Sequence, residues 1–124
     1  MIKILCGFLI MSLSLVASNL TEAMDKAQTQ KKLILVELVM ESCSYCEKME
    51  KFVLSKEEVK NRLDRHYVFL KLDINKDEIP ELLTSRMTPT FYFVSSDASQ
   101  VLYEVQGAAS KSEFVTLLER FEKK

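Results

Sequence analysis

The sequence has few side chains that could hold a metal ion: three cysteines and one histidine in 124 residues. Cys6 lies in an N-terminal segment that resembles a signal peptide, so cleavage of that segment leaves two cysteines and His66. A structural zinc site requires four ligands. The sequence therefore argues against a zinc centre, and we expect His66, which ends a predicted helix next to Arg65, to be a solvated side chain.

An excess of positive charge is also missing. The formal net charge is −1, and lysines alternate with glutamates along the predicted helices. A domain that binds nucleic acid typically presents a basic face to the phosphates. We therefore expect no nucleic-acid partner.

The chain has no apolar run long enough for a permanent transmembrane helix. The uncharged segment Ile4–Val16 has about 13 residues, whereas roughly 20 are needed to cross a bilayer. It follows Lys3 and precedes small residues ending at Ser18, which is the order of a secretory signal peptide. An uncleaved N-terminal anchor is the alternative. We predict a signal peptide over residues 1–18 and one domain over 19–124.

Four segments of that domain have strand character, and the first is apolar almost throughout, as a strand covered on both faces would be. A polar stretch at 96–100 suits a hairpin between the last two. A strand–helix–strand unit gives parallel neighbours and a hairpin gives antiparallel ones. We predict an α/β fold with a central mixed four-stranded sheet flanked by helices on both faces. The predicted strands are Leu33–Val39, Tyr67–Asp73, Thr90–Ser95 and Val101–Gln106.

Helical spacing of apolar residues fills the gaps, so the predicted order is αβαβαβ followed by βα. Capping boxes at Ser55–Glu58 and Ser110–Glu113 predict two helix starts. Asp77 is expected to cap a further short helix that contains Pro80 in its first turn. The apolar residues expected on this short helix are Ile79, Leu82 and Leu83. The buried stripe expected on the helix after residue 43 consists of Cys46, Met49, Phe52 and Val53.

Cys43 and Cys46 form a Cys-x-x-Cys motif, which occurs in redox pairs, in zinc sites and in structural disulfides. Here it follows a buried strand and opens an amphipathic helix. Cys43 is therefore predicted at a helix N-terminus, where unpaired amides and the helix dipole favour a thiolate and can lower a thiol pKa to roughly 3.5–7.5. Cys46, one turn further, is expected to be shielded and to react only after Cys43 has formed a mixed disulfide.

With these features the chain resembles the thioredoxin superfamily over nearly all of residues 19–124. The features that match are the strand LILVELV before the motif, the Thr-Pro-Thr turn at 88–90 and Gly107 before the last helix. The resemblance implies the thioredoxin fold and thiol–disulfide exchange. It also implies that Pro89 is cis beside the cysteines and that the backbone of Thr88 pairs with an extended substrate segment. Two further residues, Ser44 and Tyr45, are expected to contact substrate.

Two charged residues also match the superfamily. Glu37 lies six residues before Cys43 in an apolar strand, where thioredoxins carry a buried acid, and Lys71 matches the lysine beside that acid. A carboxylate in such a strand is costly unless it has a partner or a role. We interpret Glu37 as the group that exchanges a proton with Cys46. The alternative is that Glu37 points outward at a strand edge.

The chain also departs from thioredoxins. It has no tryptophan, and Ser42 and Ser44-Tyr45 stand where thioredoxins carry tryptophan and Gly-Pro. The closer resemblance is to small exported bacterial thioredoxin-like proteins of the SoxW type and to the thioredoxin-like domain of transmembrane reductant conduits. Together with the predicted signal peptide, the resemblance implies a periplasmic oxidoreductase with the Cys43–Cys46 disulfide in place of a cofactor. We expect a reductase; an oxidase and an isomerase are the alternative directions of electron flow.

Several partners and two alternative functions follow. The partners expected are proteins or small thiols that carry disulfides, together with a membrane reductant or oxidant, and we expect a monomer. One alternative is a non-catalytic thioredoxin-fold binding module with a stable disulfide. The other is a copper(I)-binding or other metal-binding dithiol protein, since soft thiolates suit copper(I).

Overall fold

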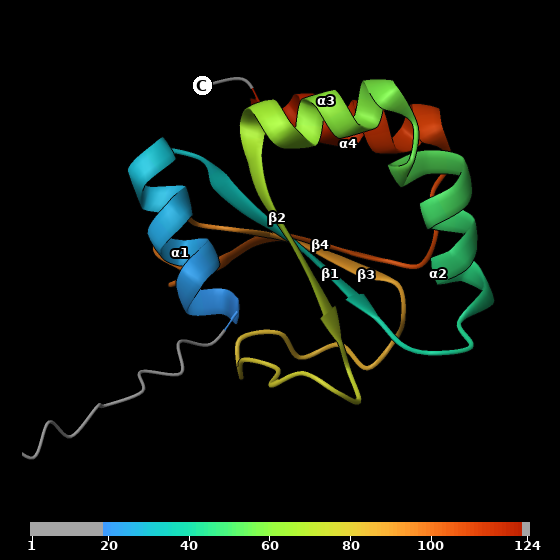
Figure 1. The fold of residues 1–124 in the computed structure, drawn as a ribbon, viewed down its shortest axis with the longest axis horizontal. Helices are drawn as coiled ribbons and strands as arrows, with labels where there is room; N and C mark the ends of the chain where they lie inside the picture. Colours follow the sequence, from blue (N-terminus) through green and yellow to red (C-terminus); the bar gives the residue numbers. More distant parts are fainter. Residues whose placement is uncertain (1–18, 123–124) are drawn as a thin grey trace, which may run out of the picture.

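The strand β1 (Leu33–Val39) is central to the sheet in the computed structural model, which describes residues 19–122 (Figure 1). β2 (Tyr67–Asp73) pairs parallel to β1, and β3 (Thr90–Val94) pairs antiparallel to it on the other side. β4 (Val101–Gln106) extends the sheet beyond β3, so the strand order is β2-β1-β3-β4. The mixed four-stranded sheet is confirmed.

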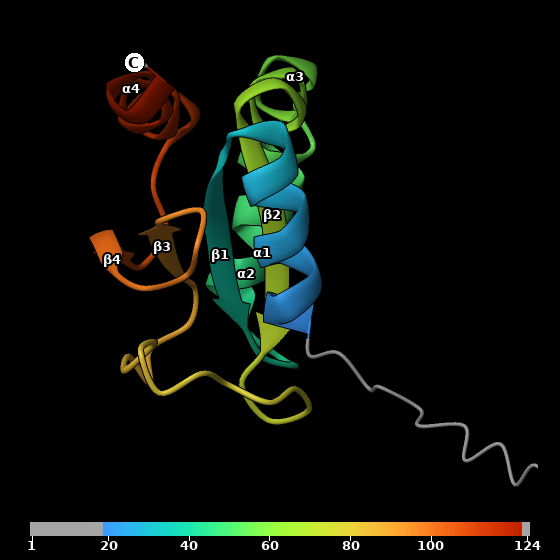
Figure 2. The same ribbon diagram turned by 90° about the vertical axis from the view of Figure 1, so that its left-hand side faces the viewer.

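Helices cover both faces of the sheet, as predicted. α1 lies on one face, whereas α2, η1, α3 and α4 lie on the other (Figures 1 and 2). η1 is a π-helical turn that directly continues α2. The helical elements are α1 (Asn19–Gln30), α2 (Ser44–Met49), η1 (Glu50–Leu54), α3 (Glu57–His66) and α4 (Lys111–Glu122).

The alternation of side chains along β1 divides the core into two clusters. Ile34, Val36 and Leu38 pack with α1 residues, whereas Leu35 packs with Met49 and with α3 and α4 on the opposite face. Successive side chains of a strand point to opposite faces. Glu37 therefore lies on the Leu35 face, below α2, while the five central residues of the strand are all buried.

The prediction of a short helix after Asp77 is wrong. The structure shows turns and irregular backbone over residues 74–89. The Asp77 carboxylate accepts the Asp73 N–H at 2.7 Å, and Leu83 N–H donates to Pro80 O at 3.0 Å. Proline disfavours the α conformation of Ile79 and removes a donor, and a segment this short cannot offset the cost of helix nucleation. Its apolar side chains still cover the α1 face of the sheet, where Leu83 is buried.

The expected burial of Phe52 is also wrong. Ser55 N–H donates to Glu50 O at 2.9 Å, the five-residue spacing of a π-helix, whose turn is wider than an α-turn. The wider turn buries Val53 and Leu54 and leaves the Phe52 side chain 55% exposed. An α-helical period continued from α2 therefore assigns the wrong face to residue 52.

The two predicted capping boxes have different outcomes. Ser55 Oγ donates to Lys51 O at 2.8 Å, and α3 begins beyond it with Lys56 at the N-cap, so the first box is wrong. In the second box the predicted cap by Ser110 is confirmed, since Glu113 N–H donates to Ser110 Oγ at 3.2 Å. The π-helical turn directly before Ser55 explains the difference, because Ser55 still belongs to its hydrogen bonding.

Candidate active site

Cys43 and Cys46 form a disulfide at the start of α2, with their Cα atoms 5.2 Å apart. Cys43 is the N-cap residue, and its Sγ accepts the Cys46 backbone N–H at 3.1 Å. Cys43 is partly exposed, whereas Cys46 is only 8% exposed. The motif thus combines an accessible sulfur at a helix N-terminus with a shielded sulfur one turn further along.

The Thr88–Pro89 turn lies against the accessible sulfur. Thr88 Oγ1 donates to Cys43 Sγ at 3.4 Å, and the Thr88–Pro89 peptide bond is cis. Pro89 is buried, and its carbonyl accepts the Gly107 N–H at 2.8 Å. Gly107 has φ +89°, a conformation that residues with a Cβ rarely adopt. Three segments distant in sequence therefore meet at the cysteines.

A closed ring of hydrogen bonds shapes the backbone just before Thr88. Met87 N–H donates to Ser85 Oγ at 3.1 Å, and Thr90 Oγ1 donates to Met87 O at 2.6 Å. The two hydroxyl oxygens lie 3.0 Å apart. Because Thr90 gives its proton to Met87, the Ser85 hydroxyl donates to Thr90. Sequence reasoning missed this ring, although serine and threonine in a turn are a known signal for such local bonds.

Glu37 is 1% exposed and has β2 and β3 on either side of its strand. The alternative of an outward-pointing side chain at a strand edge is therefore wrong. Neither of its carboxylate oxygens has a hydrogen-bond partner among the described residues. Burial raises the pKa of Glu37 to about 7; Lys71 opposes the rise and Glu50 adds to it. Glu37 can thus exchange a proton near neutral pH.

Lys71 connects this buried carboxylate to the surface. Glu37 and Lys71 are partners in the parallel β1–β2 register, with Lys71 Nζ 3.9 Å from Glu37 Oε1. The same Nζ lies 3.2 Å from Glu50 Oε2 at the start of η1, and the Lys71 side chain is 44% exposed. Sequence reasoning missed Glu50, although it follows Cys46 by one helical turn. The charged group consists of two carboxylates around one ammonium.

Ser44 and Tyr45 lie on the exposed first turn of α2, between the two cysteines. The Tyr45 side chain is 58% exposed, and Lys48 Nζ lies 5.1 Å from the centroid of its ring. Both residues can be reached by a molecule that approaches the Cys43 sulfur. Their contact with substrate, and the roles of the other predicted site residues, stay predictions.

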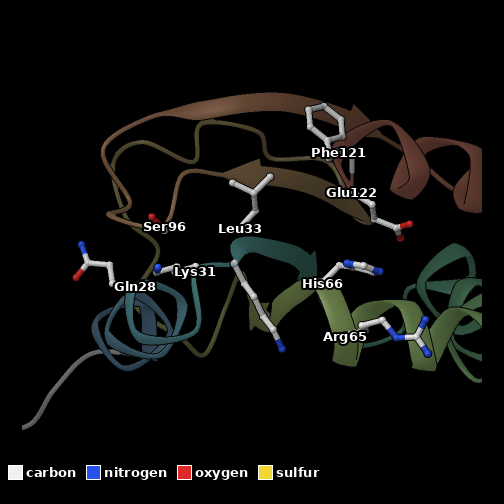
Figure 3. A pocket seen from close by; sticks show the side chains of 9 residues that line it. Gln28, Lys31, Leu33, Arg65, His66, Ser96, Phe121 and Glu122 are labelled. Atoms are coloured by element: carbon white, nitrogen blue, oxygen red, sulfur yellow. The ribbon is translucent and has the colours of Figure 1, made fainter. Parts of the chain in front are cut away.

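His66 lies far along the sheet from the cysteines. It ends α3 and lines a pocket of about 450 Å³ with Lys32, Leu33, Arg65 and Phe121 (Figure 3). This pocket adjoins the first residue of β1, whereas the motif follows the last residue of that strand. The structure therefore does not bring His66 together with the redox pair.

A sequence profile of the thioredoxin-like domain family matches residues 20–122. The chain belongs to this family. Among solved structures, a thioredoxin from Thermus thermophilus is 26% identical over 80% of each chain, with a TM-score of 0.66. Comparison with curated proteins gives no match.

Two more distant structures share the fold. The oxidised C-terminal domain of DsbD from Neisseria meningitidis is 24% identical, with a TM-score of 0.64, over 82% of this chain and 92% of that one. The reduced periplasmic thioredoxin SoxS from Paracoccus pantotrophus is 19% identical, with a TM-score of 0.58, over 73% and 95%. The predicted fold and superfamily are confirmed, while the SoxW-type subgroup stays a prediction.

Further observations concern membrane-spanning helices, metal ligands and the predicted signal peptide. Between residues 19 and 122, no helix has the length and apolar character to span a bilayer. The same residues contain no group of three or more histidine, cysteine, aspartate or glutamate side chains placed to hold a metal ion. The predicted signal peptide, residues 1–18, lies outside the described residues.

Proposed function

We propose that this thioredoxin-like chain is a periplasmic thiol–disulfide oxidoreductase that reduces disulfides of proteins or small thiols. The observation that carries the proposal is the environment of Cys43 Sγ. Cys43 is the N-cap residue of α2 and is partly exposed, and its Sγ accepts hydrogen bonds from Cys46 N–H and Thr88 Oγ1. Donors and a helix N-terminus both favour the thiolate, which is the form that attacks disulfides.

The reaction has two steps, which transfer two electrons from the dithiol to the client. The Cys43 thiolate attacks one client sulfur, which forms a mixed disulfide and releases the other client sulfur as a thiolate. Cys46 then loses its proton, attacks Cys43 Sγ and releases the second client thiolate as the Cys43–Cys46 disulfide forms. Glu37, buried on the α2 face with a pKa raised to about 7, accepts the Cys46 proton.

Substrate lies across the exposed side of the motif in this proposal. An extended client segment pairs with the backbone of Thr88, beside Pro89, and contacts Ser44 and Tyr45. The hydrogen bond from Thr88 Oγ1 to Cys43 Sγ and the bond from Gly107 N–H to Pro89 O hold this edge next to the attacking sulfur. Lys71 lies on the other side of Glu37 and tunes its proton affinity.

Reduction of clients, insulin for example, tests the activity. The reduced protein should catalyse turnover with dithiothreitol as electron source, and Cys43→Ser should abolish it, because no thiolate then stands at the helix N-terminus. Absence of turnover by the unmodified protein would instead support a binding module or a dithiol metal carrier. Equilibration with glutathione tests the direction. A potential near that of thioredoxin, about −270 mV, supports a reductase, and one near −120 mV, roughly that of DsbA, would indicate an oxidase.

The periplasmic location rests on the order of Lys3, the apolar run and Ser18. A reductase in an oxidising periplasm must itself be reduced, so the proposal includes a membrane partner that supplies electrons. Mass spectrometry of the protein from its native host should find a chain beginning near Asn19 in the periplasmic fraction. Recovery of the full-length chain from the cytoplasm would contradict this location.

A further inference from the structure

An apolar groove runs along the outer side of α2 and η1, beginning at Tyr45. It has a volume of about 360 Å³, which lies at the lower end of the range for ligand pockets. Almost all of its lining is carbon, and no acidic side chain belongs to it. Residues that form this groove include Tyr45, Met49, Phe52, Val53, Ala108 and Ala109.

The π-helical turn η1 makes this groove. It turns Phe52 further outward than α-helical spacing would, and the ring stands in solvent, 55% exposed. Together with Tyr45, it gives two exposed aromatic rings on one short stretch of chain. π-helical turns occur frequently at functional sites, and large exposed aromatic side chains are characteristic of contact surfaces.

Lysines surround the apolar floor. Lys48 Nζ lies 5.1 Å from the centroid of the Tyr45 ring, and Lys51 Nζ lies 5.4 Å from that of Phe52. Within residues 19–122, neither ammonium lies within ion-pair distance of a carboxylate. Lys111 at the far wall is already paired with Glu58, at 3.0 Å. Two lysine charges are therefore available to a ligand.

The groove adjoins the edge where the client is proposed to bind. Gly107 N–H donates to Pro89 O at 2.8 Å, and Ala109 N–H donates to Met49 Sδ at 3.3 Å. These two contacts tie one short segment to the cis-proline turn at one end and to α2 at the other. Because two residues of chain span at most about 7 Å, a client segment beside Pro89 needs only a few more residues to enter the groove.

We propose that this groove selects clients in which an apolar side chain, a few residues from the reactive cysteine, is flanked by carboxylates. The apolar side chain packs between the Tyr45 and Phe52 rings, and the carboxylates pair with Lys48 and Lys51. This inference rests on the proposed oxidoreductase function and names the client chemistry of the same site. The rings and the lysines lie beside the motif and form no bond in the sulfur transfer, so their contribution is to the choice of client, which the ratio of rates for two clients measures.

Two synthetic peptides test the proposal. Each carries one cysteine as a mixed disulfide with thionitrobenzoate, and a leucine four residues away flanked by two glutamates in one peptide and by two lysines in the other. The reduced protein attacks the peptide sulfur and releases the coloured thiolate, which is the better leaving group. At low ionic strength the acidic peptide should react about tenfold faster, and this ratio should shrink towards one in about 0.5 M salt.

The variant Lys48→Glu/Lys51→Glu should reverse the preference, and Phe52→Ala should slow the reaction with both peptides by about fivefold, because a large exposed contact is lost. The matched control is Lys26→Glu/Lys60→Glu, which changes the net charge equally on α1 and α3, outside the groove, and should keep the wild-type ratio. The same ratio in the groove variant as in the wild type would overturn the proposal, as would an equal change in the control. Failure to react with either peptide, or with insulin, would instead contradict the oxidoreductase function itself.

Discussion

Glu37 and Lys71 lie side by side in the parallel β1–β2 register, with 3.9 Å between Glu37 Oε1 and Lys71 Nζ. The lysine is closer to Glu50, at 3.2 Å, and is partly solvated, so its charge is shared. It therefore offsets only part of the cost of burying Glu37, whose oxygens have no hydrogen-bond partner among the described residues. This balance explains why the pKa of Glu37 is raised to about 7 despite an adjacent cation.

The raised pKa predicts how stability depends on pH. In the unfolded chain Glu37 ionises near its ordinary pKa of 4.5, and in the folded protein near 7. Between pH 4.5 and 7, Glu37 is protonated in the folded protein and ionised in the unfolded chain, so the folded state binds more protons than the unfolded state. The free energy of unfolding therefore falls as pH rises through this range, by about 3 kcal/mol in all. Glu37→Gln removes this loss. The variant should gain stability relative to the wild type as pH rises through this window.

Urea denaturation of the oxidised proteins at several pH values measures the effect. The difference between variant and wild type cancels the contributions of the other titrating groups. A difference that is the same at pH 4.5 and at pH 8 would contradict the assigned pKa. Lys71→Met is a second check, because loss of the cation should raise the pKa of Glu37 further and move the transition to higher pH.

Glu37→Gln should also affect the second step of catalysis. Without a proton acceptor for Cys46, release of the mixed disulfide should slow by about 10²-fold, as is typical for loss of a general base, while attack by Cys43 changes little. Stopped-flow measurements that resolve both steps give the two rates. Unchanged second-step rates from about pH 6 to pH 9 would show that another group accepts the proton.

The two cysteines should differ in reactivity. Cys46→Ser should accumulate mixed disulfides with clients, because the attacking thiol remains and the resolving thiol is missing. Cys43→Ser should trap few, since Cys46 is only 8% exposed. Alkylation of the reduced protein, followed by mass spectrometry, should modify Cys43 first. Equal alkylation rates for the two thiols would contradict the assignment of Cys43 as the attacking thiol.

The hydrogen-bond ring before Thr88 leads to a further prediction. Thr90→Val removes the buried Thr90 hydroxyl, leaves the partly buried Met87 O and Ser85 hydroxyl without their partner, and should cost about 1 kcal/mol of stability. It should also raise KM for a peptide disulfide, because the Met87–Thr88 backbone is no longer held. Thr90→Ser keeps the hydroxyl and should retain the wild-type KM. Equal KM values in both variants would assign the ring a role in stability alone.

The sheet was predictable because each strand carries its own signal. The continuous apolar run of β1 shows that both its faces are covered, and in that context Glu37 stands out as a buried acid. The backbone of residues 74–89 was harder to predict. Ile79, Leu82 and Leu83 have helical spacing, and only the backbone restrictions around Pro80 oppose a helix. The places of the Phe52 and Glu50 side chains depend on the π-helical turn that continues α2. Periodicity in the sequence does not report such a turn.

The π-helical turn can be regarded as one residue inserted into an otherwise continuous helix. Removing Val53 would restore the α-helical period, place Leu54 on the buried face and bring the Phe52 ring closer to that face, so the outer wall of the groove would be lower. The strands, the cysteines and the cis-proline turn all lie outside this segment. In genetic terms, one codon in a helix therefore sets how far the second aromatic ring beside the disulfide stands out into solvent.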